Sequence, residues 1–167
     1  MNERIIVLLR IIKNKSAFSG SELVKMVRRE NNSKRNYLLV NSVQGKHIPA
    51  DPSRVLELFR QLAEEVKIHI NSEKTVFIGF AETATAVGAG VASHFKNSYY
   101  VHTTRETGTE GEPVAEFREE HSHAAEQLLY CNRWDEIISD ARHIVFVEDE
   151  ISTGNTSLKK SEPRAST

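Results

Sequence analysis

The stretch His143–Thr156 constrains the fold of this chain more than any other part of the sequence. It opens with an unbroken apolar run, Ile144–Val147, which is typical of a parallel strand buried on both faces. Two acids, Glu148 and Asp149, follow the run directly. Because ligands bind at the carboxyl ends of the strands in an open α/β sheet, these acids are expected at the mouth of a binding site. Carboxylates there can accept hydrogen bonds from sugar hydroxyls or hold a hydrated divalent cation.

The second half of the stretch has the residues of an anion-binding loop. It consists of small and hydroxyl-bearing residues, namely Ser152, Thr153, Gly154, Asn155 and Thr156. Gly154 lets the backbone come close to a ligand, and successive N–H groups of a tight loop can point at an anion. A helix starting at about Asn155 would add the positive end of its dipole. Acids beside such a loop predict a site for a phosphorylated sugar, and an ordinary Asp/Ser/Gly turn after a core strand is the alternative.

Composition restricts the class of protein. The chain has 167 residues, of which 39% are hydrophobic and 27% charged, as in a soluble globular domain with a real core. The net charge of -1 provides no overall positive field for nucleic acid. A single cysteine, Cys131, excludes an intramolecular disulfide and a cysteine cluster for zinc, and it predicts a reducing, cytoplasmic setting. The apolar run Ile5–Leu9 is too short for a secretory signal, and no segment reaches transmembrane length.

Hydrophobic periodicity and capping signals predict alternating helices and strands. Residues 3–13 fit a short helix or a strand. A capping box at Ser19–Glu22 predicts a helix to about Arg29. Asp51–Pro52 predicts the start of a second helix, in which apolar residues recur with the helical period as far as Val66. The remaining expected elements are strands over 37–43, 75–80 and 98–103, helices over 86–95 and 133–142, and a helix with Ala124, Ala125, Leu128 and Leu129 on one face.

Three other features of the sequence predict structural rather than catalytic roles. Gly88 and Gly90 imitate a dinucleotide fingerprint, but they lie inside a predicted helix, where small residues let the helix pack close to the sheet. Residues 107–113 are rich in Gly and Glu without periodicity, which predicts a mobile lid. A basic patch is predicted to be a solvated face rather than a nucleic-acid contact; it comprises Lys25, Arg28, Arg29, Lys34 and Arg35.

The stretch 143–156 resembles the phosphoribosyl-pyrophosphate (PRPP) motif of the type I phosphoribosyltransferases. The residues on the fixed positions of that motif are Val147, Glu148, Asp149, Thr153, Gly154 and Thr156. The segments 45–49, 79–85, 103–106 and 119–124 resemble, in addition, the phosphoribosyltransferases encoded with tellurite-resistance and stress-response clusters. The resemblance implies an α/β fold with a mostly parallel sheet flanked by helices. It also implies an N-terminal hood segment (1–36), a core (37–156) and a polar tail (157–167), with the last strands missing from a truncated core.

The resemblance further implies a reaction and the residues that perform it. A 5-phosphoribosyl group would pass from PRPP to a base-like small molecule, with Mg²⁺ as the cofactor and pyrophosphate as the second product. Glu148 and Asp149 would bind the ribose hydroxyls and the Mg²⁺, the metal mainly through PRPP, and residues 152–156 would hold the 5-phosphate. The implied pyrophosphate-binding residues are Glu82, Thr83, Ala84, Thr85 and Arg105. The implied catalytic residues are Arg105, Glu106, His121 and His123.

Some alternatives stay open at this stage. His121 and His123 fit a lid that contacts pyrophosphate or protonates the leaving group, a zinc site completed by Glu119, or an ordinary surface. The chain as a whole also fits a non-catalytic or truncated module that binds PRPP or a nucleotide, or a different α/β nucleotide-binding protein. An exposed sheet edge would favour self-association as a homodimer. Neither nucleic acid nor membrane is expected as a partner.

Overall fold

The structure is a computed structural model that describes residues 17–28, 37–45, 48–70, 74–107, 111–119, 127–149 and 156–159. It divides into two compact units, Met1–Gln61 and Leu62–Thr167, and the long helix α3 (Pro52–His69) runs across their boundary. The domain boundaries at residues 36 and 156 stay predictions. Within the described ranges, no helix has the length and apolar character needed to cross a membrane.

The described residues of the first unit form a short helix and a strand pair ahead of α3. Ser19 and Glu22 form the predicted capping box: the Ser19 N–H donates to the Glu22 carboxylate at 2.8 Å, and the Glu22 N–H donates to Ser19 Oγ at 3.3 Å. The predicted extension of this helix to Arg29 is wrong, because the following residues pair as an antiparallel ladder with a later segment. The elements are α2 (Gly20–Leu23), β1 (Lys25–Arg28) and β2 (Tyr37–Val40). The core of this unit is formed by Phe18, Val43 and Leu58.

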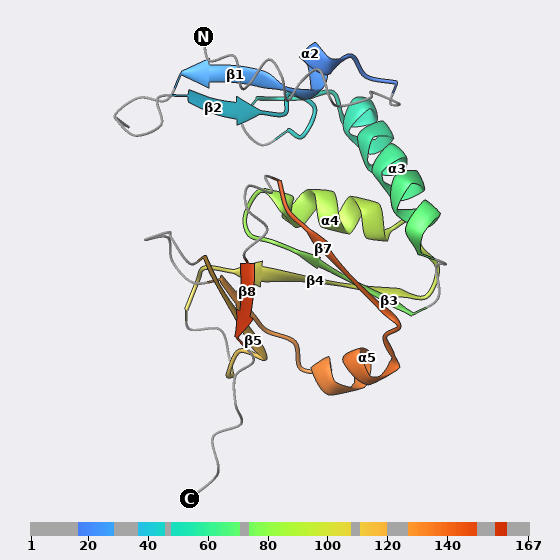
Figure 1. Cartoon of the computed structure of the whole chain (residues 1–167), viewed down its shortest axis with the longest axis vertical. Coiled ribbons are helices and arrows are strands. Elements are labelled where there is room, and N and C mark those ends of the chain that lie inside the picture. Colours follow the sequence, from blue (N-terminus) through green and yellow to red (C-terminus); the bar gives the residue numbers. More distant parts are fainter. Residues whose placement is uncertain are drawn as a thin grey trace, which may run out of the picture. The chain divides into compact units, whose positions relative to one another are not determined.

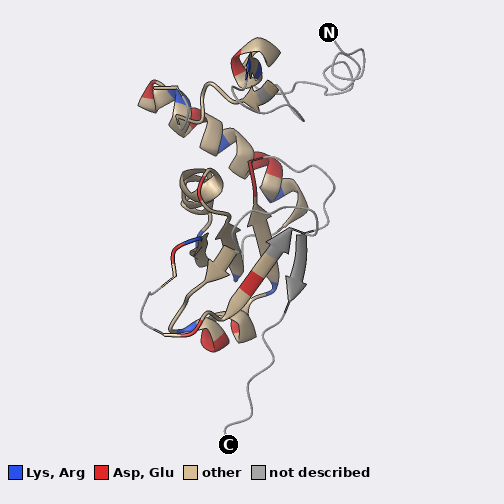
Figure 2. Ribbon diagram, turned by 90° about the vertical axis from the view of Figure 1, so that its left-hand side faces the viewer, with Lys and Arg blue, Asp and Glu red and all other residues tan. Residues whose placement is uncertain are grey.

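Helix α3 confirms the predicted capping signal. The Asp51 carboxylate accepts hydrogen bonds from the Ser53 N–H at 2.8 Å and from the Ser53 hydroxyl at 2.6 Å. These bonds satisfy donors of the first turn, and they hold the pKa of the Asp51 carboxyl below its ordinary value. Acidic and basic residues intermingle along the helix (Figure 2), for example Glu57 with Arg60 at 2.7 Å.

The second unit is α/β and contains a mixed sheet (Figure 1). The described strands follow the order β7-β3-β4-β6-β5-β8. Strands β7, β3 and β4 are parallel, whereas the pairings β4-β6, β6-β5 and β5-β8 are antiparallel. The expectation of a mostly parallel sheet is therefore correct for one half of the sheet only. The bounds are β3 (Thr75–Gly79), β4 (Ser98–Thr104), β5 (Ala115–Glu119), β6 (Gln127–Leu129), β7 (His143–Val147) and β8 (Thr156–Lys159).

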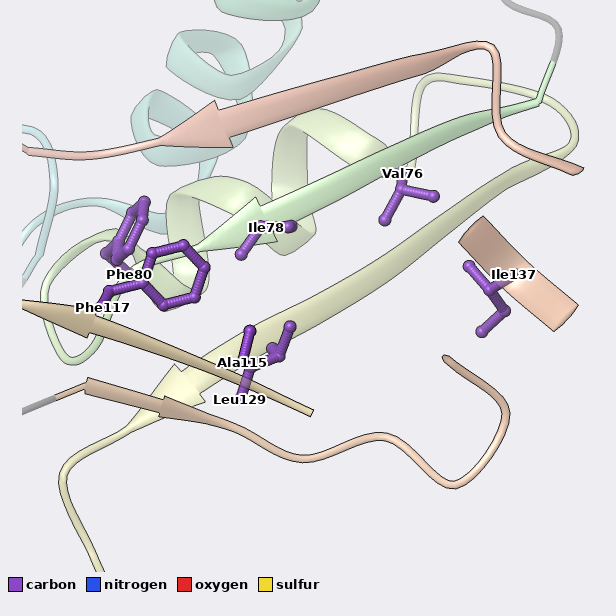
Figure 3. Packing of buried hydrophobic residues seen from close by; sticks show 7 residues of the cluster. All are labelled: Val76, Ile78, Phe80, Ala115, Phe117, Leu129 and Ile137. Atoms are coloured by element: carbon purple, nitrogen blue, oxygen red, sulfur yellow. The ribbon is translucent and has the colours of Figure 1, made fainter. Parts of the chain in front are cut away.

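Two helices of this unit pack on the parallel strands. Helix α4 (Ala84–Ala92) packs against β3 and β4, where Gly88 of the helix approaches Gly79 of the strand. Helix α5 (Trp134–Asp140) contributes Ile137 to the main apolar cluster (Figure 3). Because neighbouring side chains of a strand point to opposite faces, β3 supplies Val76 and Ile78 to this cluster and the intervening Phe77 to the other face. The remaining members of the cluster are Phe80, Ala115, Phe117 and Leu129.

Strand β3 is buried on both of its faces, whereas strand β7 is not. All five residues of β3 are buried, since it lies between two parallel neighbours. Strand β7 lies at the edge of the described sheet, and its Ile144 and Phe146 are 45% and 51% exposed. Phe146 contacts the cluster through Phe80, whose ring centroid is 5.9 Å away. The prediction that Ile144–Val147 is covered on both faces is therefore wrong.

Two predicted helices are strands instead. Leu128 and Leu129 belong to β6, where they pair with both β4 and β5, so the predicted helix is wrong at these residues. Adjacent leucines suit either conformation, and the two strand neighbours bury Leu129 completely. Thr156 begins β8, which pairs with β5, so the helix expected from about Asn155 is wrong as well. Residues 157–159, expected in a polar tail, belong to the same strand.

Candidate functional site

The carboxyl ends of three parallel strands bring the predicted site residues together. Strands β7, β3 and β4 are adjacent and in register, so the segments that follow them leave from one edge of the sheet (Figure 1). The Phe80 N–H donates to the Val147 carbonyl at 3.0 Å, which joins the end of β3 to the end of β7. The segments at this edge are Glu148–Asp149 after β7, Ala81–Thr85 after β3 and Arg105–Glu106 after β4.

The antiparallel strands extend the same edge. Leu129 of β6 pairs with Thr103 of β4 and with Ala115 of β5, so β5 starts level with the end of β4 and runs beyond it. Thr156, the last residue of the stretch that resembles the PRPP motif, pairs with Glu119 at the far end of β5. The start of β8 and the end of β5 therefore lie toward the edge that carries the acids. The topology thus gathers both ends of the motif at this edge.

The charged side chains of the candidate site reach solvent. Asp149 is exposed and Glu148 is partly buried. Ala84 is completely buried, and its N–H donates to the Phe80 carbonyl at 3.1 Å, which closes the turn after β3. Thr83 and Thr85 are partly buried, while the exposed residues of the other segments are Glu82, Arg105 and Glu106.

Several predicted site residues lie outside the described residues. They are His121, His123, Ser152, Thr153, Gly154 and Asn155. Their roles in the lid, in a zinc site and in the phosphate loop stay predictions. Within the part of the chain that the structure describes, no group of three or more His, Cys, Asp or Glu side chains is placed to hold a metal ion.

Tyr100 holds the end of the turn after β3. Its hydroxyl donates to the Thr85 carbonyl at 2.6 Å, and its ring lies against two glycines. A Cβ on Gly88 would lie 2.9 Å from the ring and 3.2 Å from the Gly79 Cα. This contact confirms that the small residues of α4 let the helix pack close to the sheet.

A prediction follows from the burial of this phenol, which raises the pKa of Tyr100 to about 12. Since folding favours the neutral phenol, its contribution to stability is complete below about pH 10 and is lost as the pH rises through about 12. Spectrophotometric titration of the wild type minus Tyr100→Phe should therefore show a single phenol with a midpoint near 12. A difference curve centred near pH 10 would show that the ring is freely hydrated.

Sequence reasoning missed two buried polar residues beside the turn. The Ala81 N–H donates to Thr103 Oγ1 at 2.8 Å, and the Thr103 hydroxyl donates to Gln127 Oε1 at 2.5 Å. The side chains of Thr103 and Gln127 are almost fully buried, with exposed fractions of 1% and 8%. The sequence does contain a signal for Thr103. This residue follows Val101 by two positions, so its hydroxyl lies on the core-facing side of the strand.

One comparison with known proteins identifies a family for this chain. A profile of one protein family, described as phosphoribosyl transferase, matches residues 23–165. No curated protein and no solved structure matches the chain. The matched range includes the acids after β7, the turn after β3 and the segment after β4. Because the match covers most of its length, the chain belongs to the phosphoribosyl transferase family.

Proposed function

We propose that the protein transfers the 5-phosphoribosyl group of PRPP to a base-like acceptor and releases pyrophosphate. Membership of the family supports phosphoribosyl transfer in general. The observation that carries the proposal is the convergence of three segments at one sheet edge: the acid pair after β7, the turn after β3 and Arg105 after β4. A sugar that bears one phosphate and one pyrophosphate needs all three kinds of contact.

The acid pair is assigned to the ribose. Asp149 is exposed at the edge, where its carboxylate can accept hydrogen bonds from two adjacent hydroxyls. Glu148, which is partly buried, is assigned to the ribose hydroxyls together with Asp149. Residues 152–156 are assigned to the 5-phosphate, because the loop follows the acids directly and Thr156 returns to the same edge in β8.

The turn after β3 and Arg105 are assigned to pyrophosphate. The planar guanidinium of Arg105 suits paired phosphate oxygens. Glu82 is exposed in the same turn, where a carboxylate would repel pyrophosphate unless a cation lies between them. The carboxylates of Glu148 and Asp149 suit Mg²⁺, which prefers oxygen and is commonly held by one or two carboxylates together with substrate phosphates. Bound there, Mg²⁺ would neutralise charge that develops on the leaving group.

The reaction breaks the bond between the anomeric carbon and the pyrophosphate oxygen, and the electron pair leaves with pyrophosphate. A new bond forms between that carbon and the nucleophilic atom of the acceptor, which releases a proton to solvent or to a base of the protein where that atom carries one. The work of the protein is to align the partners, stabilise the leaving charge and exclude water. Arg105 and Glu106 are proposed to act at the reacting groups, together with His121 and His123.

The test is direct. The full chain is incubated with PRPP and Mg²⁺ and with purine, pyrimidine or nicotinamide-like acceptors, and pyrophosphate is measured. Acceptor-dependent release that stops on chelation of Mg²⁺ is expected. Binding of PRPP without release would favour a non-catalytic module. Stronger thermal stabilisation by a nucleotide than by PRPP would favour a different nucleotide-binding protein.

A further inference from the structure

A continuous chain of buried hydrogen bonds joins three segments of the second unit. It runs from the Ala81 N–H to Thr103 Oγ1 at 2.8 Å, and from the Thr103 hydroxyl to Gln127 Oε1 at 2.5 Å. Ala81 opens the turn after β3, Thr103 lies near the end of β4, and Gln127 is the first residue of β6. The Thr103 hydroxyl is both acceptor and donor, so one side chain connects the turn to strand β6, which begins 24 residues after Thr103.

The surroundings of Thr103 are apolar. The side chain lies on the face of the sheet that carries the main cluster, and its strand partner is the completely buried Leu129. A hydroxyl at such a position is unfavourable unless its hydrogen bonds are made. Val101, two residues earlier on the same strand, packs against the same cluster without a polar group. The hydroxyl of Thr103 therefore serves its two partners rather than the packing of the sheet.

The two hydrogen-bond partners of Thr103, Ala81 and Gln127, lie at the ends of segments that carry residues assigned to the proposed site. The turn that begins at Ala81 carries the assigned pyrophosphate residues, and Tyr100 holds its other end through the Thr85 carbonyl at 2.6 Å. Arg105 follows Thr103 by two residues, and Gln127 directly follows the segment that joins β5 to β6. The hydrogen-bond chain thus ties the turn to both ends of the segment that carries Arg105 and the two histidines.

We propose that Thr103 and Gln127 are positioning residues that fix the turn after β3 relative to Arg105 and to strand β6. The proposal rests on the proposed function, since it assigns to this arrangement the binding of pyrophosphate oxygens. A misplacement of the turn by a fraction of an ångström weakens every contact that needs the turn and Arg105 together. Contacts to the ribose, which depend on Asp149 after β7, are much less affected.

The experiment compares Thr103→Val, Thr103→Ser and Gln127→Leu with the control Thr75→Val. Thr75 is a completely buried threonine of the same sheet, at the opposite end of β3, and its hydroxyl has no hydrogen-bond partner among the described residues. Binding of PRPP and of inorganic pyrophosphate is measured by calorimetry, kcat and KM from pyrophosphate release, and the folded state by thermal unfolding. Amide exchange at Ala81 reports the first hydrogen bond directly.

Thr103→Val should weaken the binding of PRPP and of pyrophosphate by about tenfold and abolish the protection of the Ala81 amide. Thr103→Ser should restore both to within about twofold, because it keeps the hydroxyl. Gln127→Leu should have a smaller effect, and the double variant should lose less than the sum of the single losses. Thr75→Val should bind like the wild type.

Two outcomes separate the inference from the proposed function. A wild type that neither binds PRPP nor releases pyrophosphate would overturn the proposed function, and the inference with it. In the second outcome, the wild type binds both ligands, and folded Thr103→Val and Gln127→Leu bind them as tightly as the wild type does. That result would overturn the positioning role alone. Should Thr103→Val fail to fold, the comparison of folded Gln127→Leu with Thr75→Val decides: weaker binding of both ligands by Gln127→Leu supports the positioning role, and equal binding overturns it.

Discussion

Replacing Asp149 with asparagine is expected to lower kcat/KM for PRPP by about 100-fold while the fold stays intact. Asp149 directly follows Glu148 at the end of β7 and is exposed, so its charge contributes little to folding. In the proposed site it accepts charge-assisted hydrogen bonds from the ribose hydroxyls, which are about twice as strong as bonds between neutral groups. Asparagine keeps the shape but replaces one acceptor oxygen with a donor.

The measurement combines initial rates of pyrophosphate release with calorimetric binding of PRPP and circular dichroism. Asp135→Asn is the matched control, since Asp135 is an exposed acid on α5, which precedes β7 and lies away from the strand ends that carry the site. The control should keep wild-type kinetics. Unchanged PRPP affinity in Asp149→Asn would remove the acid pair from the sugar site, and unfolding of this variant would show that the acid is structural.

Replacing Gly79 with alanine is expected to destabilise the protein by about 1–3 kcal/mol. The new Cβ would lie 2.7 Å from the Tyr100 hydroxyl oxygen and 3.1 Å from the Ala84 carbonyl oxygen. The carbonyl belongs to the first turn of α4, so it cannot move without the helix. The hydroxyl is held by its hydrogen bond to the Thr85 carbonyl, so relief on that side breaks a contact of the turn.

Chemical denaturation measures this loss of unfolding free energy. Gly20→Ala is the control, because a Cβ on Gly20 would meet nothing within 4 Å, and this variant should be as stable as the wild type or more stable by up to about 1 kcal/mol. A double-mutant cycle with Tyr100→Phe isolates the shortest contact, since this change removes the oxygen at 2.7 Å. Gly79→Ala should therefore be less destabilising in the Tyr100→Phe background. An equal loss in both backgrounds would show that the Ala84 carbonyl, and not the phenol, limits the space.

The parts of the fold that were predicted correctly have local signals. The start of α3 is encoded by Asp51, which hydrogen-bonds to Ser53 two residues later. The strand β3 and the short helix α2 with its Ser19–Glu22 capping box have equally local patterns, as does the placement of Glu148 and Asp149 directly after a strand. In the two caps the residues that make the contact are neighbours in the sequence, so the pattern contains the physical cause. In β3 the unbroken apolar run marks a buried strand, although its hydrogen-bond partners lie far along the chain.

The parts that were missed depend on partners far along the chain. Lys25–Arg28 and Gln127–Leu129 have patterns that a helix also accepts, and they are strands because other strands offer them hydrogen bonds. The exposure of Ile144 and Phe146 depends on the place of β7 in the order of the sheet, which no pattern within β7 contains.

The sequence by itself determined the α/β class, the acids at the end of β7 and the family motif, because strand ends, caps and turns follow from adjacent residues. Only the tertiary structure decided that the turn after β3, Arg105 and the start of β6 meet at one edge. Thr103 and Gln127 are 24 residues apart, and their hydrogen bond exists only after β4 and β6 have paired. Long-range pairing of this kind depends on the closure of the intervening loop and the burial of both strands, and neither is encoded in a local pattern.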